Sequence, residues 1–244
     1  MHNVAIIVRR ELASYFVTPL AYVFIVIFLV LAGAFTFYLG SFYERNQADL
    51  APFFNFLPWL FLFLIPAITM RLWAEERASG SIELLMTLPV TLWQTVLGKF
   101  LAAWIFAGIA LALTFPMWIT TAYLGDPDNG AIFAAYIGAL LMAGGFLAIG
   151  TCMSALTRNQ VIAFILAAVV CFLFLLSAFP MVLEFFGSFL PRAIVDAIAG
   201  FSFLTRFDAI SKGVLDVRDV LYFLMLMGAW LVATAIVLEM KKAE

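Results

Sequence analysis

The sequence predicts an all-α integral membrane protein with six transmembrane helices, and three observations support this fold class. Hydrophobic residues make up 66% of the 244-residue chain and charged residues only 11%, whereas a soluble domain carries about 25% charged residues. The mean hydropathy is +1.12. Six apolar runs, each close to the roughly 20 residues that cross the hydrocarbon core, contain no Asp, Glu, Lys, Arg or His. We therefore expect a single transmembrane domain over residues 1–244.

The six apolar runs are the predicted membrane spans. They are residues 20–39, 53–70, 100–124, 132–156, 161–183 and 220–238. The fourth and fifth runs are separated only by a short TRNQ segment, so they are predicted to form an antiparallel helical hairpin. An even number of spans places both termini on one side. That side holds eight of the 13 Lys and Arg residues, so the positive-inside rule places both termini in the cytoplasm.

Residues 1–18 are predicted to form an amphipathic helix that lies in the cytoplasmic membrane interface. Apolar side chains recur here at helical spacing. They are Val4, Ile7, Val8, Leu12 and Tyr15. The Thr18-Pro19 pair then ends this helix before the first span begins. A simple extension of the first span is the alternative.

Residues 73–99, WAEERASGSIELLMTLPVTLWQTVLGK, form a charged cytoplasmic loop between the second and third spans. Gly80 and Ser81 predict a break, and Ser81 can cap a short helix that has Glu83 in its first turn. Pro89 ends that helix. The sequence thus predicts a short charged helix, a Gly-Ser hinge and a short leucine-rich helix.

The end of this loop predicts a defined start for the helix of the third span. Thr91 and Gln94 match a capping box for the helix that becomes the third span.

The leucine-rich helix has an apolar face with a charged rim, which suits a groove on a soluble partner. A position flat on the membrane surface is the alternative.

Residues 184–219 form a 36-residue outer segment that stays apolar. Backbone at membrane depth must hydrogen-bond to itself, so we expect short helices in or on the outer leaflet. A seventh crossing is not expected, because Gly187, Pro191 and Gly200 interrupt the segment and it carries charged residues.

The sequence lacks the residue types with which a chain of this kind could power transport by itself. The only histidine is His2, no phosphate-binding GxxxxGK[ST] motif occurs, and both cysteines lie in apolar runs. Proton-coupled transporters place ionisable residues inside the membrane, and here the spans have none. We predict no catalytic residue, no metal site, no cofactor in this chain and no nucleic-acid partner.

Two segments carry a resemblance to a known family. The run EERASGSIELLMTLPVT, followed by LGK, resembles the cytoplasmic loop of ABC transporter permeases of the type-2 exporter family. The matching positions are Glu75, Gly80, Ser81, Glu83, Leu84, Leu85, Pro89 and Lys99. Residues 207–223 resemble the family's entry to its last span. The run PWLFLFLIPAITMRLWAEER is most similar to the gliding-motility-associated branch.

The resemblance implies the membrane subunit of an ATP-driven exporter in the bacterial cytoplasmic (inner) membrane. Two copies of a cytosolic ABC ATPase would bind ATP and Mg, and a second permease copy or a paralogous permease would complete the transporter in the lipid bilayer. The loop would be the coupling helix that contacts the ATPase. The coupling residues implied are Glu75, Glu76, Arg77, Gly80, Ser81, Ile82, Glu83, Leu84, Leu85 and Pro89.

Two other functions fit the same composition. The chain could be a membrane anchor that recruits a cytosolic complex through residues 73–99 without transporting anything. It could also be a channel or secondary transporter that works without nucleotide. The sequence does not identify the transported substrate or the direction of transport.

Overall fold

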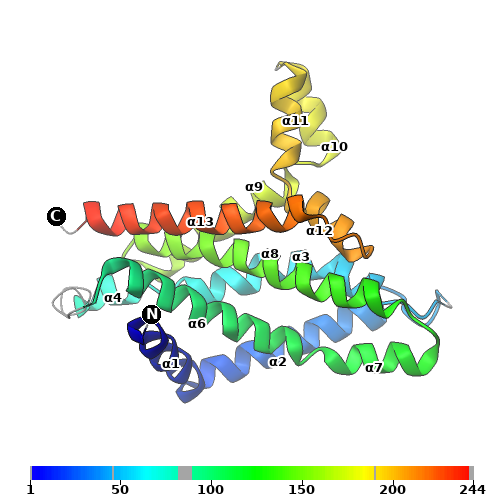
Figure 1. Cartoon of the computed structure of the whole chain (residues 1–244), viewed down its shortest axis with the longest axis horizontal. Helices are drawn as coiled ribbons and strands as arrows, with labels where there is room; N and C mark the ends of the chain where they lie inside the picture. Colours follow the sequence, from blue (N-terminus) through cyan, green and yellow to red (C-terminus); the bar gives the residue numbers. More distant parts are fainter. Residues whose placement is uncertain (1, 46, 82–89, 190, 242–244) are drawn as a thin grey trace.

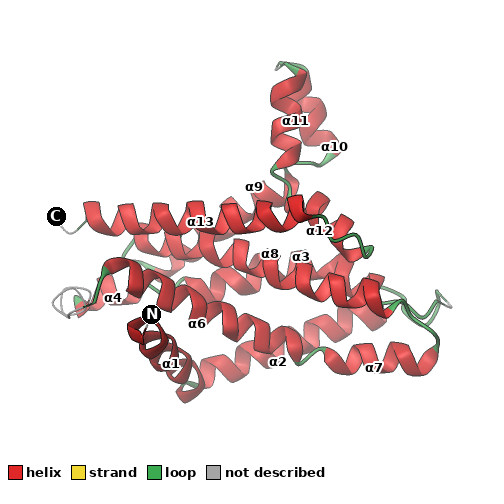
Figure 2. Cartoon of the chain, in the orientation of Figure 1, coloured by secondary structure: helices red, strands yellow, loops and turns green. Residues whose placement is uncertain are grey.

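The computed structural model describes residues 2–45, 47–81, 90–189 and 191–241, and these residues form helices and no strand (Figure 2). The helices are α1 (His2–Val17), α2 (Pro19–Ala34), η1 (Phe35–Leu39), α3 (Ala51–Thr69), α4 (Ala74–Ser79), α6 (Leu92–Ala112), α7 (Phe115–Leu124), α8 (Asn129–Leu156), α9 (Gln160–Leu176), α10 (Pro180–Gly187), α11 (Arg192–Gly200), α12 (Phe203–Ser211) and α13 (Val217–Met240). The predicted all-α class is confirmed for this part of the chain.

Five helical segments of the described chain are long and apolar enough to cross a membrane. They are Ala21–Leu39, Ala51–Ser79, Leu92–Leu124, Asn129–Leu156 and Val217–Met240. A sixth crossing is reached only if α9 and α10 are counted together, and these two helices are bent by 81°. Five of the six predicted runs therefore correspond to continuous or nearly continuous helices.

The span predicted over residues 161–183 is divided into two helices in the structure. Helix α9 ends at Leu176, and α10 begins at Pro180. Proline has no backbone N–H to donate and disfavours the helical conformation in the residue before it. Phe179 is accordingly extended, with φ −65° and ψ 134°. The chain changes direction at this point.

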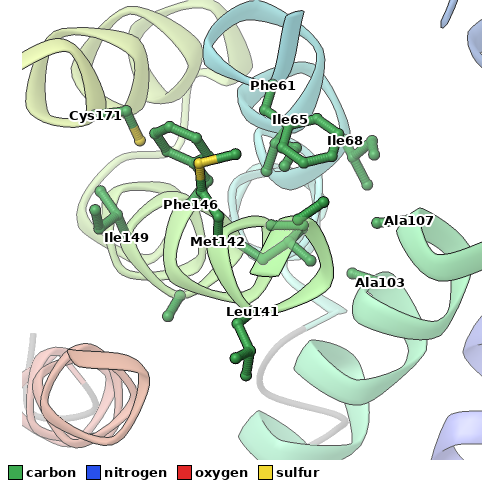
Figure 3. Close-up of a cluster of buried hydrophobic side chains, with 14 of the residues drawn as sticks. Phe61, Ile65, Ile68, Ala103, Ala107, Leu141, Met142, Phe146, Ile149 and Cys171 are labelled. Atoms are coloured by element: carbon green, nitrogen blue, oxygen red, sulfur yellow. The ribbon is translucent and has the colours of Figure 1, made fainter. Parts of the chain in front are cut away.

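Helix α8 is the central helix of the bundle and packs against α3, α6, α9, α12 and α13 (Figure 1). Figure 3 shows the contact between α8 and three of its neighbours. The labelled side chains are Leu141, Met142, Phe146 and Ile149 of α8, Phe61, Ile65 and Ile68 of α3, Ala103 and Ala107 of α6, and Cys171 of α9. This cluster forms the core on which the other helices are arranged.

Glycines of α8 allow its neighbours to approach closely. A Cβ atom at Gly144 would lie 2.5 Å from the Met227 sulfur and 3.1 Å from Trp104 Nε1. A Cβ at Gly150 would lie 2.7 Å from Thr69 Cβ. Both glycines therefore pack against helices of the same chain.

Helix α1 is separate from α2, so the alternative of a simple extension of the first span is wrong. Thr18 between them is extended, with φ −94° and ψ 141°. Figure 1 shows α1 lying at an angle to α2. Helix α1 packs along α6, where a Cβ at Gly98 would lie 2.5 Å from Ile7 Cγ2.

Short helices fill most of the predicted outer segment. Figure 1 shows α10 and α11 standing away from the bundle, and neither contains a buried residue. Helix α12 instead buries Phe203, Phe207 and Ile210 against the bundle. Arg206 of α12 donates a 2.8 Å hydrogen bond to the buried Asp219 of α13, which fixes the end of the segment.

We predict that Gly150→Ala lowers stability and that Gly228→Ala does not. The new methyl group at position 150 would collide with Thr69, which costs about 1–3 kcal/mol and lowers the melting temperature by roughly 2–4 °C per kcal/mol. A Cβ added at Gly228 of α13 would meet no atom within 4 Å, so alanine is tolerated there. Thermal unfolding of the two purified variants tests this, and equal melting temperatures would contradict the packing.

Candidate functional site

The charged loop begins with a turn and a short helix, α4, which are held by the end of α8. The backbone N–H groups of Trp73 and Ala74 each donate a 3.1 Å hydrogen bond to Ser154 Oγ. Ser154 in turn donates to the Met70 carbonyl at 3.1 Å. The first N–H groups of a helix have no partner within it, so a serine from another helix satisfies them. This fixes the start of α4 on α8.

Cationic side chains bind the last carbonyl groups of α8. The Arg77 guanidinium donates a 2.6 Å hydrogen bond to the Ala155 carbonyl. The Lys241 ammonium donates a 2.6 Å hydrogen bond to the Leu156 carbonyl. These carbonyls also lack partners within their own helix, and the negative end of the helix dipole favours cations there. Helix α4 and the end of α13 are thus tied to the same helix end.

A buried lysine joins α4 to two further helices. Lys99 of α6 is only 3% exposed. Its Nζ lies 2.7 Å from Glu76 Oε1 of α4 and 3.5 Å from Glu11 Oε2 of α1. The same ammonium lies 5.3 Å from the centre of the Trp73 ring, within the range of a cation–π interaction. We call Lys99, Glu11, Glu76 and Trp73 the lysine cluster.

Burial makes the lysine cluster more than a set of surface ion pairs. An exposed pair contributes about 0–1 kcal/mol, but removing one partner of a buried pair leaves an uncompensated charge and costs about 3–5 kcal/mol. Two carboxylates compensate the Lys99 charge, and Glu11 also pairs with Arg10 at 2.6 Å. The cluster therefore holds α1, α4 and α6 together.

The predicted capping box is confirmed. Gln94 N donates to Thr91 Oγ1 at 3.3 Å, and Thr91 N donates to Gln94 Oε1 at 3.2 Å. Asn3 Nδ2 of α1 also donates to Gln94 Oε1 at 3.4 Å. Both the loop's return into α6 and its departure through α4 are thus fixed, and α1 contacts α6 at Gln94 and at Lys99.

Of the predicted coupling residues, the structure brings Glu76 and Arg77 into this network. Glu75 points elsewhere: its side chain is 57% exposed and its Oε2 lies 3.9 Å from Arg71 Nε. Glu76 and Arg77 therefore hold α4 to the bundle, whereas Glu75 is exposed.

The remaining predicted residues lie at or beyond the end of α4. Gly80 has φ +73°, a left-handed conformation that favours glycine and ends the helix. Ser81 Oγ lies 2.9 Å from Ser79 Oγ. The other predicted residues fall outside the described part of the chain, as does the short helix predicted for them. They are Ile82, Glu83, Leu84, Leu85 and Pro89.

Sequence reasoning missed Glu11 and Ser154 as parts of this site and gave Lys99 no partner. Lys99 and Glu11 are 88 residues apart, and Ser154 is 81 residues from Trp73. No local spacing reveals such pairs. The one available signal was Glu11, an acidic residue within a helix predicted to lie in the membrane interface.

The fold and the loop define a class: a multi-pass helical membrane protein with a charged connecting segment that is braced against the bundle. The family described as ABC-2 family transporter protein matches residues 43–238. Because the match covers most of the chain, the protein belongs to the ABC-2 transporter family. No curated protein matched the chain. The family and the apolar helices indicate a membrane component of an ABC transporter, and they do not test the gliding-motility branch.

We predict that Lys99→Met destabilises the protein far more than Lys212→Met. Loss of Lys99 leaves the largely buried Glu76 carboxylate without a cation and Glu11 with Arg10 alone, at a cost of about 3 kcal/mol. Lys212 also pairs with an acidic residue, Asp208, but is 69% exposed, so its loss costs less than about 1 kcal/mol. Thermal unfolding of the purified variants measures the difference. Equal destabilisation would contradict a structural role for the lysine cluster.

Proposed function

We propose that the chain is the permease subunit of an ATP-driven exporter, and that a separate ATPase docks on residues 75–89 and moves the helices. The observation that carries this proposal is the bracing of the loop at its two described ends, α4 and the start of α6, because a partner can transmit force only through a segment whose ends are fixed to the bundle. Membership of the ABC-2 family supports it.

The contacts at the loop suggest a route for that force. A displacement of α4 would pass to α6 through Glu76 and Lys99, to α1 through Glu11, and to α8 through Ser154 and Arg77. Each of these links is an ion pair or hydrogen bond between 2.6 and 3.5 Å. Packed elements with such links shift together instead of deforming continuously.

The bundle also has places where its helices can bend. Pro58 and Pro66 lie inside α3, and proline in a helix removes a hydrogen bond and favours a kink. The third span is divided between α6 and α7 near Thr114, and α9 and α10 meet at 81°. These points would let one half of a helix move while the other half stays packed.

We infer six crossings with both termini in the cytoplasm. In Figure 1 the N-terminus and the end of α13 lie toward the end of the bundle that carries α4. An even number of crossings gives this arrangement, and counting α9 with α10 gives six. Residues 1–18 would then lie in the inner interface, residues 73–99 in the cytoplasm and residues 184–219 at the outer leaflet.

ATP and Mg would bind to the partner, in two ATPase copies, because this chain has no phosphate-binding loop. A second permease copy or a paralogous permease would complete the transporter. The coupling role extends to the full set implied by the family resemblance, including Ile82, Glu83, Leu84, Leu85 and Pro89.

Two alternative functions make different predictions. A membrane anchor without transport would bind a cytosolic complex through the same loop, but transported substrate would not stimulate the partner's ATPase activity. A channel or secondary transporter would carry flux in liposomes that contain this chain alone. Flux without nucleotide would exclude the proposed mechanism.

We predict that the Glu83→Arg/Leu85→Asp double variant loses its ATPase partner. The changes reverse a charge and place a carboxylate on the face that the sequence predicts to be apolar, and a disrupted central contact costs about 2 kcal/mol or more, which is more than tenfold in affinity. The measurement is the amount of P-loop ATPase that copurifies with the tagged chain from native membranes.

The matched control is Leu183→Asp/Glu184→Arg, which makes the same two chemical changes on α10. It should retain the ATPase at the level of the unchanged chain. Equal recovery with the loop variant would remove residues 75–89 from the docking site, and equal loss with both variants would show a general folding defect.

A further inference from the structure

A cavity of about 620 Å³ lies where α1, α2, α3, α4 and α6 meet, next to the lysine cluster. One part of its lining is charged and includes Glu11, Glu76 and Arg71. Another part is apolar and includes Phe24 and Leu64. Ligand sites have this size and this combination of a largely apolar wall with a few polar groups. The bracing of the loop does not require such a space.

Two residues that line this cavity, Arg71 and Glu76, carry buried polar atoms without partners. In the described part of the chain, three buried side-chain polar atoms have no hydrogen-bond partner: Arg71 Nε, Trp73 Nε1 and Glu76 Oε2. All three come from one six-residue stretch, and Arg71 and Glu76 line the cavity. Buried polar groups are almost always hydrogen-bonded in proteins, so their concentration at one place indicates a site for a polar ligand.

The unpartnered atoms of Glu76 and Arg71 need different partners, a hydrogen-bond donor for one and an acceptor for the other. Glu76 already accepts from Lys99 through Oε1 at 2.7 Å, and its Oε2 needs a donor. Arg71 Nε is a donor that lies 3.9 Å from Glu75 Oε2, beyond hydrogen-bond distance. It needs an acceptor. A ligand with both a cationic N–H group and an anionic oxygen satisfies the two together.

The rest of the lining suits the tail of an amphiphile. Val23 and Ile27 of α2 line the cavity and are 53% and 44% exposed, so the cavity opens beside the first apolar span. Tyr15 also lines it, and burial together with the Glu11 carboxylate raises the pKa of its phenol. That hydroxyl therefore stays protonated and adds no charge.

We propose that this cavity binds a zwitterionic phospholipid with a primary ammonium group, taken from the leaflet next to α1. The ammonium donates to Glu76, the phosphate accepts from Arg71, and an acyl chain lies along Phe24, Ile27 and Leu64. The placement in that leaflet rests on the membrane arrangement given under the proposed function. Binding itself does not depend on the ATPase.

The test is lipid retention by the purified chain alone, measured by native mass spectrometry after equal exposure to three lipids. Phosphatidylethanolamine has both required groups, phosphatidylcholine lacks the N–H donor, and phosphatidylglycerol lacks the cation. We expect retention of phosphatidylethanolamine to exceed that of phosphatidylglycerol by about tenfold, since a hydrogen bond to a charged group contributes at least that factor. Phosphatidylcholine should fall between them.

Two variants locate the binding. Glu76→Gln should abolish the preference for phosphatidylethanolamine over phosphatidylcholine, and its control is Glu184→Gln on α10. Ala67→Phe should lower retention of phosphatidylethanolamine by filling the cavity, because Ala67 lines it. Its control is Ala168→Phe on α9, which should retain lipid normally.

Equal retention of the three lipids by the unchanged chain would overturn the proposal. So would an Ala67→Phe variant that retains phosphatidylethanolamine as Ala168→Phe does, and this second comparison decides the matter if Glu76→Gln fails to fold. Because the ATPase is absent from the measurement, loss of the lipid preference would leave the docking proposal on residues 75–89 standing.

Discussion

The ion pair between Lys99 and Glu76 is the contact on which the rest of the account depends. A lysine that is 3% exposed at the start of an apolar helix must have compensating charge, because desolvation of an unpaired ammonium is costly. The compensation comes from α4 and α1, and both helices are therefore held where they can supply it. The loop between the second and third spans is consequently part of the bundle at its base and not a loose connection.

The bundle itself follows from close packing around α8. Without water to drive helices together, association in lipid depends on shape complementarity, and small residues permit the closest approach. Gly144 and Gly150 meet Met227 and Thr69 in this way. Ser154, at the end of the same helix, receives the start of α4. One helix thus organises both the lipid-embedded core and the attachment of the loop, which links packing to the proposed transmission of force.

Much of the fold could be predicted because its causes are local. Apolar runs give helices in lipid, the Thr91 and Gln94 spacing gives a capping box, and Gly80 gives a left-handed helix end. Pro180 signals a break near the end of the fifth predicted span, but the 81° angle between α9 and α10 could not be predicted, because hydropathy carries no information about helix direction. The partners of Lys99 could not be predicted, since Glu11 lies 88 residues away and only the packing of α1 along α6 brings them together.

The central claim is that the braced loop faces the cytoplasm, where a motor protein can push on it. Ser79→Cys and Ser188→Cys, each made in a Cys152→Ala/Cys171→Ala background, place one exposed thiol at the end of α4 and one at the end of α10. Labelling of intact cells with a membrane-impermeant maleimide is the measurement. Ser188→Cys should react at once, and Ser79→Cys should react only after the membrane is opened. Immediate labelling of Ser79→Cys in intact cells would contradict the central claim.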